Sequence, residues 1–251
     1  MNLEIIKEIL LFSLIPFISI ILGGFGGVFF NITGSLRGFL LHLAAGVIFA
    51  VVAIELLPDI VEKNNIVGIS IGFFAGLGVM LAIKHFSHIS QTKHKTLINT
   101  EAGNSVSTLI PWALLIGIGV DIFIDGILLG VGFVAGKSEG ILLCVALSLE
   151  ILVLGLVVAT ELKTEKIEKS KIIRIIVVLS ATFVLGAFTG SIMLSIVNEE
   201  VLTYILAFGL SALMYLVTEE LLVEAHEQKD TPLNTAVFFV GFFIFLIFAS
   251  E

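Results

Sequence analysis

Two aspartates lie four positions apart in an otherwise apolar segment, GIGVDIFIDGILLG, residues 117–130. Asp121 and Asp125 share one face of a helix, because residues four apart are neighbours on its surface. A third carboxylate, Glu150, falls in the middle of the next apolar segment. No Lys or Arg lies at that depth in either segment to neutralise these acids. Such a set of oxygen ligands favours a hard or borderline divalent cation.

An acid at the centre of a membrane helix costs about 3 kcal/mol on insertion scales. Because no basic side chain neutralises them, three such acids must be protonated, surrounded by water or bound to a metal ion. Protonated acids that hydrogen-bond between helices are the structural alternative, and protonation would also link the site to pH. We favour a metal site, because ionisable groups inside a membrane are functional by default.

The composition identifies the chain as a membrane protein. Of its 251 residues, 58% are hydrophobic and 14% are charged, whereas soluble domains average about 45–50% and about 25%. A membrane-spanning helix needs about 20 apolar residues, and eight stretches qualify. They lie near residues 5–30, 38–58, 66–84, 109–134, 140–161, 172–197, 201–224 and 232–250. We therefore predict an all-α integral membrane protein with eight transmembrane helices.

Basic residues predict the orientation, because cytoplasmic loops carry an excess of Lys and Arg. With both termini outside, the outer side receives only Lys7, Lys63 and Lys137 of the 13 basic residues. An even number of spans agrees with this orientation. The longest polar break, residues 85–108, then becomes a cytoplasmic loop between the third and fourth helices. The net charge of −8 argues against a nucleic-acid partner.

Two pairs of segments resemble each other although they cross the membrane in opposite directions. AGVIFAVVAIELLPD, residues 45–59, aligns with LSALMYLVTEELLVE, residues 210–224, and places Glu55 opposite Glu220. The segments DIFIDG and EILVLG, which begin with Asp121 and Glu150, are similar more weakly. Inverted repeats with polar groups at mid-membrane are typical of secondary transporters. They predict a 3+2+3 arrangement of the helices.

Further acids lie nearer the ends of their helices. Glu219 and Glu220 lie about one turn from the inner end of the seventh helix and would act as exit ligands, and the repeat favours Glu220. Glu224 and His226 are either further ligands or part of a solvated helix end. Glu55 lies near the outer end of the second helix, where it would either gather cations or simply be interfacial.

The remaining histidines predict no defined site. His42 begins the second helix, and one histidine near a membrane surface is better explained as structural than as a ligand. His85, His88 and His94 could collect or sense metal, but they are dispersed over the polar break without cysteines and give no fixed coordination pattern. A disordered polar loop is therefore the preferred interpretation.

With these residues the chain resembles the ZIP family of divalent metal transporters. The resemblance rests on AGVIFAVVAIELLPD and SALMYLVTEELLVEA, which are similar to family segments ending in E-L-L/I-P-E, and it covers the whole chain. It implies eight spans, both termini outside, a long cytoplasmic loop after the third span and a metal site on spans four and five. The chain would then be a single transmembrane transporter domain, residues 1–251, in the cell membrane.

The central motifs depart from the family pattern. The family's fourth span usually reads H-N-x-P-E-G, so Asp121 takes the histidine position and Asp125 the glutamate position. In the fifth span Glu150 takes the first position, while Ile151 and Leu154 replace two acids. An all-carboxylate set moves the preference from zinc toward harder ions such as Mn²⁺, Fe²⁺ or even Mg²⁺ and Ca²⁺.

The resemblance implies alternating-access transport of a divalent cation of the zinc, iron or manganese class. The expected metal-binding residues are Asp121, Asp125, Glu150, Glu220, Glu219 and Glu55. We expect no catalytic residue and no bound cofactor, since the ion is the cargo. The expected partners are this ion and the lipid bilayer, and a homodimer is left open.

Two other functions are considered. A family member that binds metal or protons as a sensor without transport remains an alternative. An intramembrane aspartyl protease is disfavoured, because such enzymes use aspartates on separate helices and Asp121 and Asp125 share one.

Overall fold

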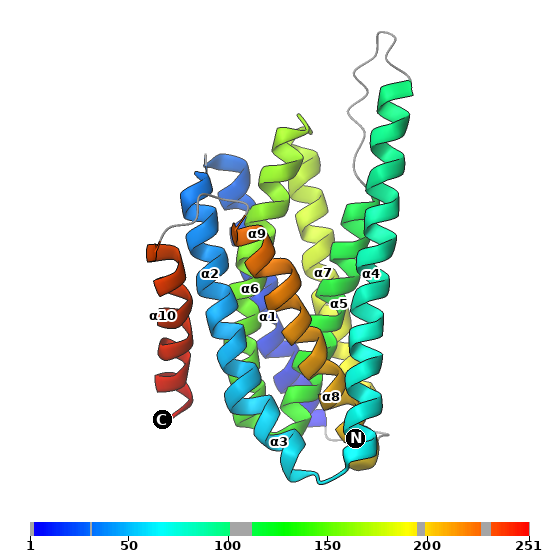
Figure 1. Ribbon diagram of the computed structural model, residues 1–251, viewed down its shortest axis with the longest axis vertical. Coiled ribbons are helices and arrows are strands. Elements are labelled where there is room, and N and C mark those ends of the chain that lie inside the picture. Colours follow the sequence, from blue (N-terminus) through cyan, green and yellow to red (C-terminus); the bar gives the residue numbers. More distant parts are fainter. Residues whose placement is uncertain (1–2, 31, 101–111, 195–198, 227–231, 251) are drawn as a thin grey trace.

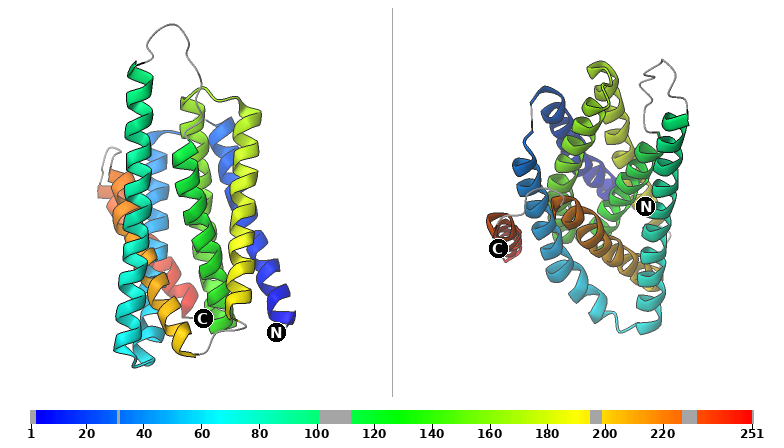
Figure 2. Two further views of the ribbon diagram at one scale, coloured as in Figure 1. Left: turned by 90° about the vertical axis from the view of Figure 1, so that its right-hand side faces the viewer. Right: turned by 45° about the horizontal axis from the view of Figure 1, so that its top comes forward.

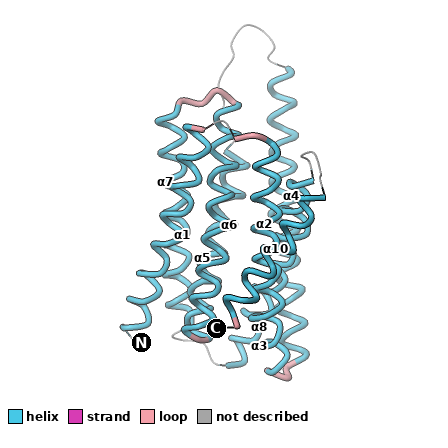
Figure 3. Tube along the Cα trace, turned by 90° about the vertical axis from the view of Figure 1, so that its left-hand side faces the viewer, coloured by secondary structure: helices cyan, strands magenta, loops and turns pink. Residues whose placement is uncertain are grey.

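The computed structural model describes residues 3–30, 32–100, 112–194, 199–226 and 232–250. Over these residues the regular elements are helices, joined by short connections (Figure 1, Figure 3). In chain order they are α1 (Leu3–Phe29), α2 (Gly34–Val51), η1 (Val52–Leu56), α3 (Leu57–Glu62), α4 (Ile66–Thr100), α5 (Trp112–Ala135), α6 (Lys137–Thr164), α7 (Lys169–Leu194), α8 (Glu199–Tyr215), η2 (Leu216–Leu221), α9 (Leu222–His226) and α10 (Pro232–Ala249). The elements η1 and η2 are π-helical turns inside longer helices.

Eight segments of the described chain are long and apolar enough to cross a membrane, which confirms the predicted number. They are Ile6–Phe29, Gly34–Glu62, Ile66–His85, Leu115–Phe133, Gly140–Thr164, Lys169–Ile192, Glu200–His226 and Pro232–Ala249. The second span combines α2, η1 and α3, and the seventh combines α8, η2 and α9. The chain is therefore an all-helical, multi-pass membrane protein.

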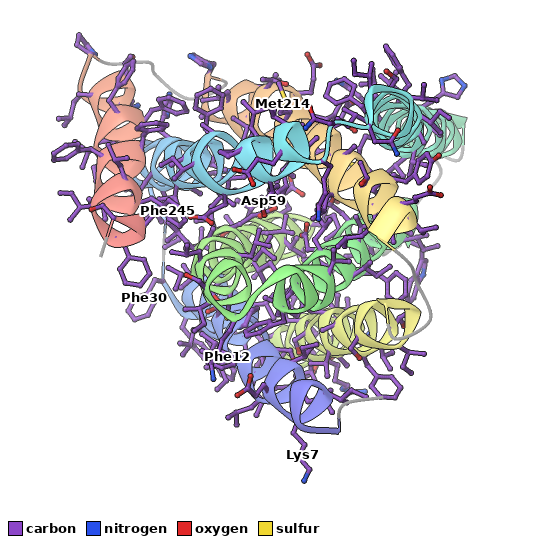
Figure 4. The ribbon with its side chains drawn as sticks, turned by 90° about the horizontal axis from the view of Figure 1, so that it is seen from below. Lys7, Phe12, Phe30, Asp59, Met214 and Phe245 are labelled. Carbon is purple, nitrogen blue, oxygen red and sulfur yellow. The ribbon has the colours of Figure 1, made fainter. Side chains whose placement is uncertain are left out.

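The helices form two layers, which Figure 4 shows from below. One layer contains α1, α5, α6 and α7, which pack on one another, and we name it the carboxylate bundle. The other contains α2, α4, α8 and α10 with the two π-helical turns, and we name it the π-helix bundle. Contacts between the two run mainly from α2 to α6 and from α4 to α5.

Glycines allow the closest helix pairs, which are α1 with α6, α5 with α7, α2 with α10 and α4 with α8. A Cβ atom added at Gly23, Gly126, Gly46 or Gly72 would lie between 1.9 and 2.3 Å from a carbonyl oxygen of the partner helix. Any larger residue would force these backbones apart, as expected for membrane helices that associate through small residues.

These pairs correspond under the predicted inverted repeat. If the first three spans match the last three in order and the fourth matches the fifth, α1 corresponds to α7, α2 to α8, α4 to α10 and α5 to α6. The α2–α10 pair then corresponds to the α8–α4 pair, and the α1–α6 pair to the α7–α5 pair. Aligning Glu55 with Glu220 also superposes η1 on the last five residues of η2. Both observations support the 3+2+3 arrangement, which stays a prediction.

The first described residues of α1 and the last of α10 lie at the same end of the molecule (Figure 1, Figure 2). The opposite end is the one at which α4 extends beyond the other helices. This agrees with an even number of spans. The assignment of the α4 end to the cytoplasm remains a prediction, and we refer to it below as the predicted cytoplasmic end.

The segment expected to be a loop, residues 85–108, begins as helix, because α4 continues to Thr100. The expectation of a loop is therefore wrong for the first part of the segment. The sequence KHFSHISQTKHKTLINT contains neither Gly nor Pro, so its polar residues end the apolar stretch without breaking the helix. Residues 101–111 and the side chains of His88 and His94 lie outside what the structure describes.

Candidate metal site

Three predicted acids meet in the middle of the carboxylate bundle. Asp121 and Asp125 lie near the middle of α5, and Glu150 lies at the middle of α6. Each offers one carboxylate oxygen, and the three oxygens all lie within 4.8 Å of one another. The structure thus brings together the residues that the sequence selected by their type and depth.

These carboxylates are buried, with Asp121 9%, Asp125 3% and Glu150 1% exposed. Oδ2 of Asp125 and both carboxylate oxygens of Glu150 have no hydrogen-bond partner among the described residues. None of the ion pairs formed in the described part of the chain includes these three acids. Leaving polar oxygens buried and unpaired is costly, and a bound cation would satisfy them.

The unpaired oxygens argue against the structural alternative. Protonated acids that hold helices together must hydrogen-bond to them, yet neither oxygen of Glu150 does so among the described residues. The donor set is therefore better suited to an ion than to a contact between helices.

The two halves of the site are built alike. A Cβ on Gly126 of α5 would lie 2.2 Å from the carbonyl oxygen of Phe183 on α7, and one on Gly155 of α6 would lie 2.5 Å from that of Ile20 on α1. These glycines occupy the sixth positions of DIFIDG and EILVLG. In both helices an acid thus lies in the central cluster. About a turn and a half after that acid, a glycine allows the helix to pack closely against an outer neighbouring helix.

Glu220 extends the acidic set into the π-helix bundle. It lies in η2 and is half-buried. The neighbouring Glu219 is exposed and forms an ion pair with Lys84 of α4, with 2.8 Å between Nζ and Oε2. Of the two predicted exit ligands, Glu219 is thus paired at the surface and Glu220 is half-buried, and the role of either in metal release stays a prediction.

Glu55 does not join the central cluster. It lies in η1 and is half-buried. Asp59 follows one turn later in α3, and Figure 4 shows it between α3 and the green helices α5 and α6, at the boundary of the two layers. Both acids lie in the part of the second span at the end of the molecule where the termini lie (Figure 1), and whether they gather cations or are simply interfacial stays open.

A charged network joins three helices at the predicted cytoplasmic end. The guanidinium of Arg37 on α2 binds Glu224 of α9 through Nη2 and through Nε, the latter at 2.8 Å. Its Nη2 also lies 3.8 Å from a carboxylate oxygen of Glu161 on α6. Sequence reasoning missed this role of Arg37, because 187 positions separate it from Glu224.

Two histidines also meet at this end, one interpreted from the sequence as structural and the other left open as a ligand or part of a solvated helix end. The rings of His42 on α2 and His226 on α9 have centroids 5.3 Å apart. Their pairing lies outside the predicted ligand set.

Comparison with known proteins gives one result that bears on this site. A family model described as ZIP Zinc transporter matches residues 84–249. The match covers all three central acids and both residues of the Glu219–Glu220 pair, and it begins after Glu55. A search of curated proteins found no match.

Proposed function

Because the chain belongs to the ZIP zinc transporter family, whose members transport divalent metal ions, we propose that Asp121, Asp125 and Glu150 form its ion-binding site. The observation that carries this proposal is the set of three buried carboxylates with unpaired oxygens within 4.8 Å. Two oxygens on one ion, each about 2.1–2.4 Å from it, lie at most about 4.2–4.8 Å apart. Small side-chain rotations would therefore bring all three residues into one coordination sphere.

The donor atoms favour harder ions than zinc. Carboxylate oxygens suit Mn²⁺ and Mg²⁺, whereas imidazole and thiolate ligands suit zinc better. The central cluster offers three carboxylates and no nitrogen or sulfur ligand among the described residues. We therefore propose Mn²⁺ or Fe²⁺ as the preferred cargo, with zinc as a competing ion.

The two-layer architecture supports alternating access. The central carboxylates belong to the carboxylate bundle, whereas Glu55 and Glu220 belong to the π-helix bundle at the two repeat-related turns. Movement of one bundle against the other would bring the central ion first toward Glu55 and Asp59 and later toward Glu220. π-Helical turns frequently occur at functional sites, and here each carries an acid of the proposed path.

The test is metal flux into proteoliposomes with the Asp125→Asn variant. This change preserves side-chain volume and removes one ligand charge, so we expect flux of Mn²⁺, Fe²⁺ and Zn²⁺ to be lost while the protein stays monodisperse. Glu62→Gln, an exposed acid at the end of α3, serves as the matched control. Wild-type flux through Asp125→Asn would refute the assignment of the site.

The same assay separates the alternatives. Metal binding by the wild-type protein without flux would favour the sensor. Protease chemistry gains no support from the geometry, because both aspartates lie on α5.

A further inference from the structure

Two imidazole side chains from opposite repeats meet at the predicted cytoplasmic end. His42 lies on α2 and His226 ends α9, and their rings are 5.3 Å apart at an interplanar angle of 69°. Neither belongs to the carboxylate cluster. The spacing alone is compatible with simple ring packing, so the hydrogen bonds of each ring decide what the pair can do.

Each ring is held in the same way by the backbone. Nδ1 of His42 lies 2.7 Å from the carbonyl oxygen of Gly38, and Nδ1 of His226 lies 2.5 Å from that of Leu222. A carbonyl oxygen only accepts a hydrogen bond, so Nδ1 must carry the proton in both rings. In the neutral form, each ring then keeps its lone pair on Nε2. A backbone carbonyl that holds the second ring nitrogen is typical of metal-binding histidines.

The Nε2 atom of His42 has no hydrogen-bond partner among the described residues, although His42 is only 2% exposed. A buried acceptor without a partner costs free energy, which a metal ion would recover. Two imidazoles on one tetrahedral zinc ion, with Zn–N bonds of about 2.0–2.1 Å, have ring centroids about 5 Å apart. The observed distance therefore fits one shared ion.

The surrounding charge does not oppose a cation. Arg37 is the nearest basic residue before His42 in the sequence, and its guanidinium is engaged by Glu224 and also approaches Glu161. One positive charge thus faces two negative charges in this network.

We propose that His42 and His226 bind a divalent ion of the zinc class through their Nε2 atoms. This second site differs chemically from the central one, because imidazole prefers borderline ions such as Zn²⁺, Co²⁺ and Cu²⁺. Water completes the coordination sphere. Binding at this site does not require transport, so a test of this proposal is independent of a test of the proposed function.

The chain has five histidines, which makes the pair easy to isolate. In a background that carries His85→Gln, His88→Gln, His94→Gln and Asp125→Asn, only His42 and His226 remain as imidazoles. Zn²⁺ binding to this protein in nanodiscs is measured by calorimetry. We expect one additional equivalent compared with a baseline variant that also carries His42→Gln and His226→Gln.

Single substitutions then test each ligand. Loss of one imidazole should weaken zinc binding by about tenfold or more. His226 is exposed, so His226→Gln should fold normally. This variant therefore tests zinc binding by the pair even if His42→Gln proves unstable. Equal zinc affinity in the background and in His226→Gln would overturn the proposal.

A spectroscopic readout identifies the ligands directly. Cu²⁺ bound to the background protein should show pulsed-EPR modulation from two imidazole rings, and from one ring after His226→Gln. Modulation that is absent from the background, or unchanged by the substitution, would also overturn the proposal.

Discussion

Asp121 on α5 and Glu150 on α6 present carboxylate oxygens within 4.8 Å of each other, and they are the first residues of two similar segments, DIFIDG and EILVLG. The segments lie on helices that run in opposite directions through the predicted repeat. An ion held between these two acids would therefore lie close to the axis that relates the repeats. Inverted-repeat transporters bind their substrates at such a position.

Glu150→Gln should separate ion binding from stability. It keeps the side-chain volume but removes a buried carboxyl group whose oxygens have no hydrogen-bond partner among the described residues, so the metal-free protein should be as stable as wild type or more stable. The stabilisation by added Mn²⁺, about 2.7 kcal/mol at a concentration 100 times Kd, should disappear. Thermal unfolding in detergent with and without metal measures both effects. An undiminished metal-induced shift would exclude Glu150 as a ligand.

Asp121→His should change which ion is preferred. It introduces an imidazole at the position where the family pattern has histidine, and imidazole suits zinc better than manganese. The ratio of Zn²⁺ flux to Mn²⁺ flux should rise by about tenfold, which corresponds to about 1.4 kcal/mol. Competition flux in proteoliposomes measures the ratio, with Glu62→Gln as the control. If both variants keep the wild-type ratio, residue 121 does not contact the ion.

Gly126→Ala should destabilise the carboxylate bundle. The added Cβ would lie 2.2 Å from the carbonyl oxygen of Phe183, so α5 and α7 must separate. We expect a loss of about 1–3 kcal/mol in the free energy of unfolding in detergent. Gly78→Ala on α4 is the matched control, since its Cβ would meet nothing within 4 Å. Equal stability of the two variants would show that the α5–α7 contact tolerates a methyl group.

Arg37→Gln should cost more stability than Lys84→Gln. Removal of Arg37 leaves the half-buried Glu224 without the guanidinium that binds it, which should cost about 1–3 kcal/mol. Lys84 and Glu219 are both exposed, so their pair is worth about 0–1 kcal/mol. Chemical denaturation of the two variants in the same detergent compares them. The opposite order would mean that the Arg37 network does not hold α2, α6 and α9 together.

The clustering of the three central acids was largely predictable because its signals are local. Apolar length identifies each span, and the depth of an acid within its span follows from a simple count along the helix. Asp121, Asp125 and Glu150 have similar depths on consecutive spans, so neighbouring helices were expected to bring them together. No further ligand was needed for this inference, since the absence of basic residues at that depth already required a cation, water or protons.

The positions of helix ends, and the different surroundings of two adjacent residues, were harder to predict. The length of α4 was underestimated because polarity ends an apolar stretch without ending a helix. Glu219 and Glu220 are neighbours in sequence, yet Glu219 is exposed and pairs with Lys84, whereas Glu220 is half-buried. The π-helical turn η2 changes the rotation per residue at this point, and hydrophobic periodicity does not reveal such a turn.

The sequence by itself determined the membrane class, the number of spans and which acids form the central cluster, because each depends on short-range pattern and residue type. Only the tertiary structure decided that Arg37 binds Glu224 and that His42 meets His226. These partners lie on α2 and α9, far apart in the chain, and they meet because the packing of whole helices brings the ends of α2 and α9 together. Such contacts depend on how entire helix surfaces pack together, and a local sequence pattern does not predict this packing.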